Sequence, residues 1–168
     1  MSRAQTLVFE EHIMKLFNFF IKKEPLTQKP PTEKGKTGAL GEALAKEYLE
    51  NLGYKLKDKN FRHSHSETDL IMQDGNCIVF CEVRTQSVDK KHYKTPAESI
   101  SDNKKLSLAK GASYYMARHY HDSPINCRFD VVEVFLEKGG LQKINHIKNA
   151  FYAPRKTLKG TRYKSCKK

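Results

Sequence analysis

TDLIMQDGNCIVFCEVR, residues 68–84, is the stretch that decides the fold. Two runs rich in apolar and β-branched residues flank Gly75-Asn76, and this pair favours the tight turn of a β-hairpin because glycine adopts positive φ easily. Paired positions in such a hairpin sum to 151, so Asp69 lies directly opposite Glu82. Their Cβ atoms would then be about 4.5–5.5 Å apart.

Two facing carboxylates repel each other, so this register predicts a cation between Asp69 and Glu82. Arg84 lies two residues beyond Glu82 and therefore on the same face of the sheet. Acids beside a permanent positive charge at strand ends are typical of a metal-dependent phosphodiesterase. Two plainer interpretations stay open: the acids are ordinary strand-edge residues, or Arg84 forms a cross-strand ion pair with Glu67, which could also orient it toward the site.

Glu42 is a third acidic candidate, on a helix expected over residues 38–52 with Gly53 as its C-terminal cap. Its carboxylate lies beside the apolar stripe, where it needs a partner or a metal, unless it serves only the helix dipole. Mg²⁺ (or Mn²⁺) prefers oxygen ligands and usually takes one or two carboxylates. The hypothesis is that Asp69 and Glu82 bind the ion directly and that Glu42 adds a contact through water.

Other polar residues favour plainer roles. His63 and His65 alternate with Glu67 and Asp69, so an extended segment would place four possible metal ligands on one face. The interleaved serines instead indicate a polar loop with solvated histidines. Asp130 lies among the apolar residues Phe129, Val131 and Val132, which favours a buried structural pairing over support of catalysis.

Composition favours one basic domain. The chain has 168 residues, with 31 Lys and Arg against 19 Asp and Glu, a net charge of +12. Such a domain usually meets a polyanion, either nucleic acid or an anionic membrane surface. Residues 152–168 form a basic tail that is either a solvated end or a nucleic-acid contact. The candidate contacts in this tail are Arg155, Lys156, Lys159 and Arg162.

The four cysteines show no C-x-x-C spacing, and Cys77 and Cys81 read as small apolar fillers of one strand face. This pattern requires neither a disulfide nor a zinc site and favours a reducing, cytoplasmic location. No apolar run approaches the roughly 20 residues that a transmembrane helix needs. Residues 16–21 are too short for one, although an interfacial anchor is an alternative.

The chain divides into four parts. Residues 1–23 form an N-terminal extension with a short helical pattern, and 24–37 are a proline-containing linker. Residues 38–151 form the domain, in which the first helix is followed by strands at 54–61 and in the hairpin. A second helix is expected at 101–119, with strands at 127–136 and 141–147. Helix, strands, helix and strands predict an α/β fold, a mixed β-sheet flanked by helices.

Several motifs together resemble the YraN-type family of predicted bacterial endonucleases, over roughly residues 38–151. They are Gly38-Ala39-Leu40-Gly41-Glu42-Ala43-Leu44-Ala45, Tyr48-Leu49, Gly53-Tyr54, Asn60-Phe61-Arg62, Glu67-Thr68-Asp69-Leu70-Ile71, Val79-Phe80-Cys81-Glu82-Val83-Arg84 and Arg128-Phe129-Asp130-Val131-Val132. That family is considered a distant relative of archaeal Holliday-junction resolvases in the PD-(D/E)xK nuclease superfamily.

The resemblance implies a restriction-endonuclease-like fold and Mg²⁺-dependent cleavage of DNA. Carried over by position, Glu42, Asp69 and Glu82 match the acidic site residues, and Arg84 stands where the superfamily has lysine. The family usually has Gly-Glu-Ile-Asp where this chain has Ser-Glu-Thr-Asp at 66–69. The change to Arg84 bears on turnover more than on binding, because a bulkier cation crowds the metal or displaces the water.

Three hypotheses follow. The first is an endonuclease acting on structured or branched DNA, for which paired cuts would favour a homodimer. The second is a nucleic-acid-binding module that kept the fold but lost turnover with the lysine. The third is a protein-interaction adaptor that docks through residues 1–23.

Overall fold

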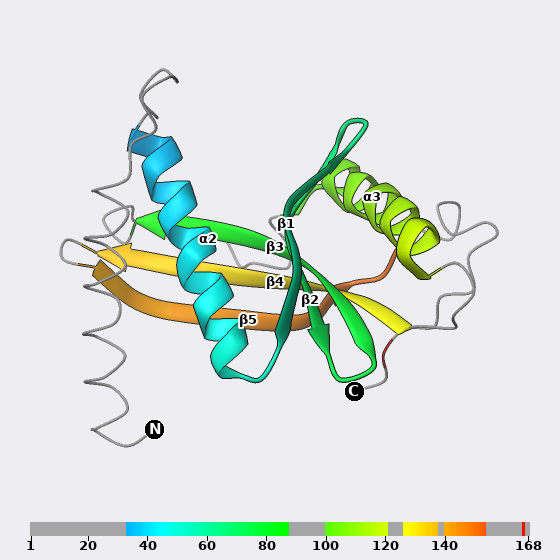
Figure 1. Ribbon diagram of the computed structural model, residues 1–168. Coiled ribbons are helices and arrows are strands. Elements are labelled where there is room, and N and C mark those ends of the chain that lie inside the picture. The colour runs from blue at the N-terminus through cyan, green and yellow to red at the C-terminus, as the bar shows by residue number, and fades with distance from the viewer. Residues whose placement is uncertain (1–32, 88–99, 121–125, 138–139, 154–165, 167–168) are drawn as a thin grey trace, which may run out of the picture.

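The computed structural model describes residues 33–87, 100–120, 126–137, 140–153 and 166. These residues form one five-stranded sheet and two helices (Figure 1). In chain order the elements are α2 (Glu33–Asn51), β1 (Lys55–His63), β2 (Ser66–Asp74), β3 (Cys77–Ser87), α3 (Asp102–Tyr120), β4 (Asn126–Glu137) and β5 (Gly140–Phe151). The expected helix at 1–23, the linker as far as residue 32 and the four candidate basic residues of the tail lie outside the described ranges.

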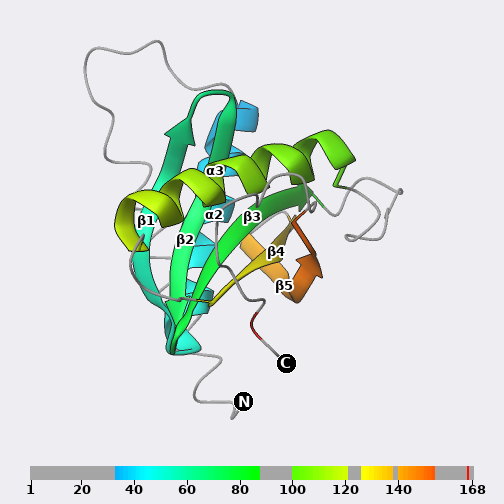
Figure 2. The same cartoon turned by 90° about the vertical axis from the view of Figure 1, so that its right-hand side faces the viewer.

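The sheet is mixed, with strand order β1-β2-β3-β4-β5. Only β3 and β4 run parallel, and the other neighbours are antiparallel. A parallel pair needs a crossover connection, and α3 lies within it. Figures 1 and 2 show α2 and α3 on opposite faces of this sheet. The prediction of an α/β fold with a restriction-endonuclease-like mixed sheet is confirmed.

The β2–β3 hairpin has the predicted register. The pairs run from Leu70 with Cys81 to Asp74 with Cys77, so each pair sums to 151. Of the two turn residues only Gly75 has positive φ, at 55°, which a residue without Cβ adopts at little cost. The next positions along this register are Asp69 and Glu82, beyond the last paired residues.

Helix α2 covers one face of the sheet through Leu44, Ala45 and Leu49, which pack against alternate residues of β2 and β3. It ends where predicted, because Gly53 adopts a φ of 89° and the backbone amide of Tyr54 returns to the carbonyl of Leu49. It begins at Glu33, which is five residues earlier than the pattern at Gly38 indicates.

Helix α3 covers the opposite face with a larger apolar cluster. Its buried positions follow helical spacing and contact Ile71, Ile78 and Phe80 of the central strands. They are Leu108, Ala109, Gly111, Ala112, Tyr115 and Met116. A Cβ at Gly111 would collide with the hydroxyl of Ser66, so glycine lets the helix approach the start of β2 closely.

Asp130 forms the structural pairing that its apolar strand predicted. It is fully buried, and Arg128 Nε lies 3.1 Å from each of its carboxylate oxygens. The backbone amide of Asn149 donates to the same carboxylate at 3.0 Å, and His146 Nε2 lies 2.9 Å from it. Arg128 also donates to the Tyr54 hydroxyl at 2.8 Å. This network ties β4 and β5 to the end of α2.

The cysteines require a correction. Cys77 forms a disulfide with Cys166, with Cα atoms 6.3 Å apart, so the expectation that no disulfide is needed is wrong. The partners are 89 residues apart in sequence, and only the folded chain brings residue 166 to the start of β3. Cys81 and Cys127 are buried and free, consistent with apolar fillers.

Candidate active site

Asp69 lies at the end of the paired part of β2 and reaches across to β3. The backbone amide of Val83 donates to Asp69 Oδ2 at 2.7 Å, which fixes the carboxylate beside Glu82. Burial, together with the negative charge of Glu82, raises the pKa of Asp69 to about 6, although the Val83 hydrogen bond and Lys104 oppose the shift. The Val83 hydrogen bond and the charge of Lys104 therefore do not fully offset the cost of ionising the Asp69 carboxyl group.

Glu82 is buried, with 9% of its side chain exposed. Lys104 Nζ of α3 lies 2.9 Å from Glu82 Oε2. This is an ion pair without hydrogen-bond geometry, since no donor from the described part of the chain meets that oxygen at suitable angles. A buried carboxylate oxygen that has a nearby charge but no directed donor can accept a further cation or donor.

Glu42, on α2, interacts electrostatically with Asp69 from the other layer of the fold. Burial raises the pKa of Glu42 first, the charge of Asp69 raises it further, and a side-chain hydrogen bond from Asn60 lowers it. Because Gly41 has no side chain, this part of α2 can lie against Thr85 of β3. Glu42 and Asp69 are thus electrostatically coupled although they come from different layers.

The donor set suits a hard divalent cation. No group of three or more His, Cys, Asp or Glu side chains within the described ranges is spaced to hold a metal ion by itself. Mg²⁺, however, keeps several waters and takes as few as one or two carboxylates, with substrate phosphate completing its shell. Asp69 and Glu82 provide two neighbouring carboxylates, and one oxygen of Glu82 has no directed donor in the described ranges.

Arg84 shares the sheet face of Glu82 by strand alternation, and its side chain is half-buried. The paired register ends at Leu70 and Cys81, so Glu67 and Arg84 are not paired positions of the ladder. Glu67 binds Arg62 of β1, whose Nη2 lies 2.7 Å from Glu67 Oε1. The roles of Arg84 in catalysis and of Glu67 in orienting it stay predictions.

Lys104 is the residue that the sequence did not single out. The position of Lys104 at the start of a helix could have indicated that it pairs with an acid. Lys104 and Lys105 occupy the first turn of α3, where the positive end of the helix dipole disfavours cations. Lys105 Nζ lies 3.1 Å from Asp102 Oδ1 in the same turn. An acid to pair with Lys104 is then expected on another element of the fold.

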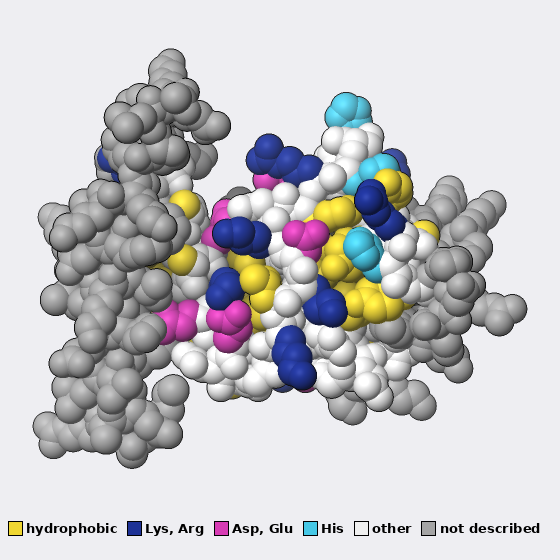
Figure 3. Space-filling view, in the orientation of Figure 1, with side chains coloured by type: hydrophobic (Ala, Val, Ile, Leu, Met, Phe, Trp, Pro, Cys, Tyr) yellow, Lys and Arg dark blue, Asp and Glu magenta, His cyan; other side chains and the backbone are white. Residues whose placement is uncertain are grey.

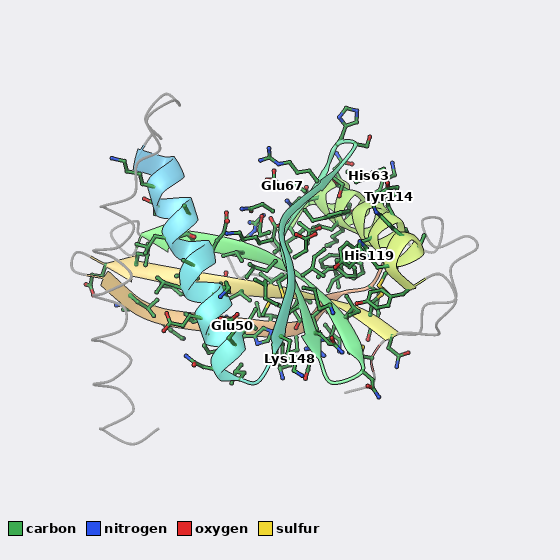
Figure 4. All side chains as sticks on the ribbon, in the orientation of Figure 1. Glu50, His63, Glu67, Tyr114, His119 and Lys148 are labelled. Atoms are coloured by element: carbon green, nitrogen blue, oxygen red, sulfur yellow. A yellow bond between two sulfur atoms is a disulfide. The ribbon has the colours of Figure 1, made fainter. Side chains whose placement is uncertain are left out.

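The histidines do not form a metal site with the acids. A turn at residues 64–65, with Ser64 at a φ of 54°, separates β1 from β2 and breaks the alternation that would align the four side chains. His63 instead stacks on Tyr114 of α3, with ring centroids 3.5 Å apart. Figure 4 shows this pair beside α3, with Glu67 nearby on the β1–β2 hairpin.

No helix in the described ranges is both long enough and apolar enough to cross a bilayer. On the face shown in Figure 3, Lys and Arg side chains are spread among the acids.

Comparison with known proteins places the site inside the part of the chain that a family model matches. A family model described as "Uncharacterised protein family UPF0102" matches residues 41–134, which include all three acids, Arg84 and Lys104. A UPF0102 protein of Symbiobacterium thermophilum is 42% identical over 118 residues, covering 70% of this chain and 98% of the relative. One from Syntrophus aciditrophicus is 39% identical over 120 residues, covering 71% and 91%. One from Caldicellulosiruptor bescii is 40% identical over 115 residues, covering 68% and 95%.

Proposed function

The chain belongs to the UPF0102 family, the YraN family, and we propose that it is a metal-dependent endonuclease that hydrolyses phosphodiester bonds in DNA. The observation that carries the proposal is the pair Asp69 and Glu82. Burial and mutual repulsion raise the pKa of Asp69 to about 6, which is unfavourable for a purely structural carboxylate. A divalent cation would relieve that repulsion.

Asp69 and Glu82 would hold Mg²⁺ or Mn²⁺, and Glu42 would contact it through water. When bound, such an ion polarises a phosphoryl oxygen and lowers the pKa of an attacking water. The protein's own residues supply orientation and charge. The Val83 amide fixes the Asp69 carboxylate, and the Lys104 ammonium stands at Glu82, where it can stabilise charge that develops on the phosphoryl oxygens.

Arg84 and Lys104 share the task that one lysine performs in the related nucleases. Arginine keeps its charge at every working pH and cannot accept a proton, so Arg84 contributes binding and charge stabilisation only. Lysine is a compact point charge that tolerates close approach to a carboxylate. The position of Lys104 at Glu82 supports turnover despite the arginine at position 84.

DNA, and branched DNA in particular, is proposed from the family resemblance and from the net charge of +12. A homodimer and a cytoplasmic location belong to the same proposal, and in a reducing cytoplasm the Cys77–Cys166 pair would be present as two thiols. The basic tail would add sequence-independent contacts to phosphates.

A catalytically impaired DNA-binding module is the second candidate, because Lys104 already neutralises Glu82 without a metal. The two differ in one assay. The endonuclease nicks supercoiled or branched DNA with Mg²⁺ or Mn²⁺, and Asp69→Asn abolishes nicking. The binding module retains DNA without cutting it under any divalent ion. The adaptor hypothesis depends on residues 1–23, which lie outside the described ranges.

A further inference from the structure

One face of α3 remains open to solvent and combines an aromatic ring with two cations. Lys110, Tyr114 and Arg118 are exposed and follow each other at intervals of four residues, so they form one stripe along the helix. Tyr114 is 39% exposed, which is unusual for a large side chain beside a packed core. Figure 3 shows hydrophobic and histidine side chains gathered where α3 lies in Figure 1, with Lys and Arg beside them.

The tyrosine belongs to a set of rings contributed by two elements. His63 of β1 stacks on Tyr114 with centroids 3.5 Å apart and planes 8° from parallel. Phe61 lies 6.5 Å from Tyr114 at 24°, and it meets Tyr115 edge-on at 5.1 Å. We call Phe61, His63 and Tyr114 the aromatic platform. Because His63 and Tyr114 are stacked face to face, each ring covers one face of the other and only the outer face of the stack can meet a base. Rings fixed in this way have little rotamer entropy left to lose on binding.

The aromatic platform is held in place by contacts between α3 and the β1–β2 hairpin. The Ser66 hydroxyl donates to the Ser107 carbonyl at 2.8 Å, and the Ser107 hydroxyl donates to the His65 carbonyl at 3.1 Å. Gly111 permits the close approach because a Cβ there would collide with Ser66. The relative position of His63 and Tyr114 is therefore fixed by the fold.

The same helix connects the aromatic platform to the acidic site. Lys104 reaches Glu82, and Tyr114 follows ten residues later (114 − 104). At a rise of about 1.5 Å per residue the two lie about 15 Å apart along α3. That span corresponds to about four stacked nucleotides at about 3.4 Å each. Figure 4 shows Glu67, His63, Tyr114 and His119 in the same part of the molecule.

We propose that the aromatic platform binds an unpaired base of the DNA substrate by stacking, with Lys110 and Arg118 neutralising the adjoining phosphates. Every base offers a π-face once it leaves the duplex, whereas an internal base pair hides both faces. The inference rests on the proposed function and specifies its substrate: DNA with an unpaired segment a few nucleotides from the bond that is cut. A fork or branch point is such a substrate.

The test measures DNA binding in EDTA, so cleavage plays no part. Fluorescence anisotropy compares blunt duplex, forked duplex and single-stranded DNA for wild type, Tyr114→Leu and Tyr114→Phe. Loss of one stacked base should weaken forked and single-stranded binding by about 5- to 150-fold in Tyr114→Leu. Tyr114→Phe should retain wild-type affinity, and blunt-duplex affinity should stay within about two-fold. A 2-aminopurine placed in the unpaired segment should lose fluorescence with wild type and keep it with Tyr114→Leu.

Leu52→Ala is the control, because Leu52 is 50% exposed and directly follows α2, on the opposite face of the sheet from α3. It should bind all three DNAs as wild type does. Equal affinities of Tyr114→Leu and wild type for unpaired DNA would overturn the inference, and so would an equal loss on blunt duplex. A dimer that dissociates in Tyr114→Leu would assign the surface to self-association and also overturn it. Failure of wild type to cleave any DNA would remove the endonuclease and leave this binding result standing.

Discussion

Lys104 Nζ lies 2.9 Å from Glu82 Oε2, which joins the first turn of α3 to the edge of the acidic site. Without a divalent ion this ammonium is a cation in direct contact with Glu82, and it lowers the pKa of Asp69 against the larger effect of burial. A metal ion bound by Asp69 and Glu82 would compete with Lys104 for the same oxygen. The lysine would then be released toward the incoming phosphate.

Lys104→Gln should therefore affect metal binding and turnover in opposite directions. Removal of the competing ammonium should strengthen Mn²⁺ binding, measured by calorimetry. Loss of the positive charge should lower the cleavage rate about 100-fold or more, as seen when one preorganised charge-stabilising donor is removed. Lys105→Gln is the control, since that neighbour pairs with the exposed Asp102 and should change the rate by about two-fold at most. Parallel losses of metal affinity and rate in Lys104→Gln would contradict the competition.

Asp69→Asn and Glu82→Gln should each remove the stabilisation that Mg²⁺ gives. At a ligand concentration 100 times its dissociation constant, binding stabilises a native protein by about 2.7 kcal/mol. For this chain that corresponds to a rise in Tm of about 5 °C or more. The rise can be measured by thermal melts with and without Mg²⁺ at on the order of 10 mM. Wild type should show it, and the two variants should not.

Glu50→Gln is the control for both acids. Glu50 is exposed on α2, pairs with Lys46 at 2.7 Å, and lies away from Glu67 and the hairpin in Figure 4. Its Mg²⁺-dependent shift in Tm and its cleavage rate should match wild type. An unchanged shift in Asp69→Asn would mean that the ion binds elsewhere.

The metal-free protein should lose stability as pH rises through the range in which Asp69 ionises. The pKa of Asp69 is raised to about 6 from 3.8, first by burial and then by Glu82, so folding favours its protonated form. This contribution is fully present below pH 3.8, the unfolded value, and is lost as pH rises through about 6. Asp69→Asn stays neutral throughout.

Urea unfolding in EDTA at several pH values would measure the difference between Asp69→Asn and wild type. The variant should be the more stable protein above about pH 6, and the two should converge toward pH 4. Saturating Mg²⁺ at pH 7.5 should raise the free energy of unfolding of wild type toward that of the variant. A difference that does not change with pH would exclude Asp69 as the titrating group.

The hairpin and the acids on it could be predicted from sequence because their geometry is local. Gly75-Asn76 sets the turn, and alternation then places Asp69 beside Glu82 without any knowledge of the rest of the chain. Lys104 could not be found in this way. Its contact with Glu82 depends on how the crossover returns α3 over the sheet, which no short-range pattern contains.

Two other features were missed for related reasons. The start of α2 at Glu33 was missed because residues 33–37 are polar or glycine and carry no apolar stripe for periodicity to detect. The pair Cys77–Cys166 closes a separation of 89 residues, and connectivity over such a distance is not encoded in cysteine spacing. The fold was therefore predictable through its hairpin, and the candidate site only as far as the neighbouring positions of Asp69 and Glu82, whose function stays a prediction.

The disulfide between Cys77 and Cys166 should contribute to stability in non-reducing solution. A cross-link stabilises chiefly by restricting the unfolded chain, and more so for long loops. Because the partners are 89 residues apart in sequence, Cys166→Ser should lower the free energy of unfolding by about 2–4 kcal/mol. Urea unfolding would measure the loss, and wild type treated with a reductant should then match the variant.

Thiol titration of the denatured, unreduced protein should count two free cysteines, Cys81 and Cys127. Four free thiols, or identical unfolding with and without reductant, would show that the cross-link does not form in solution.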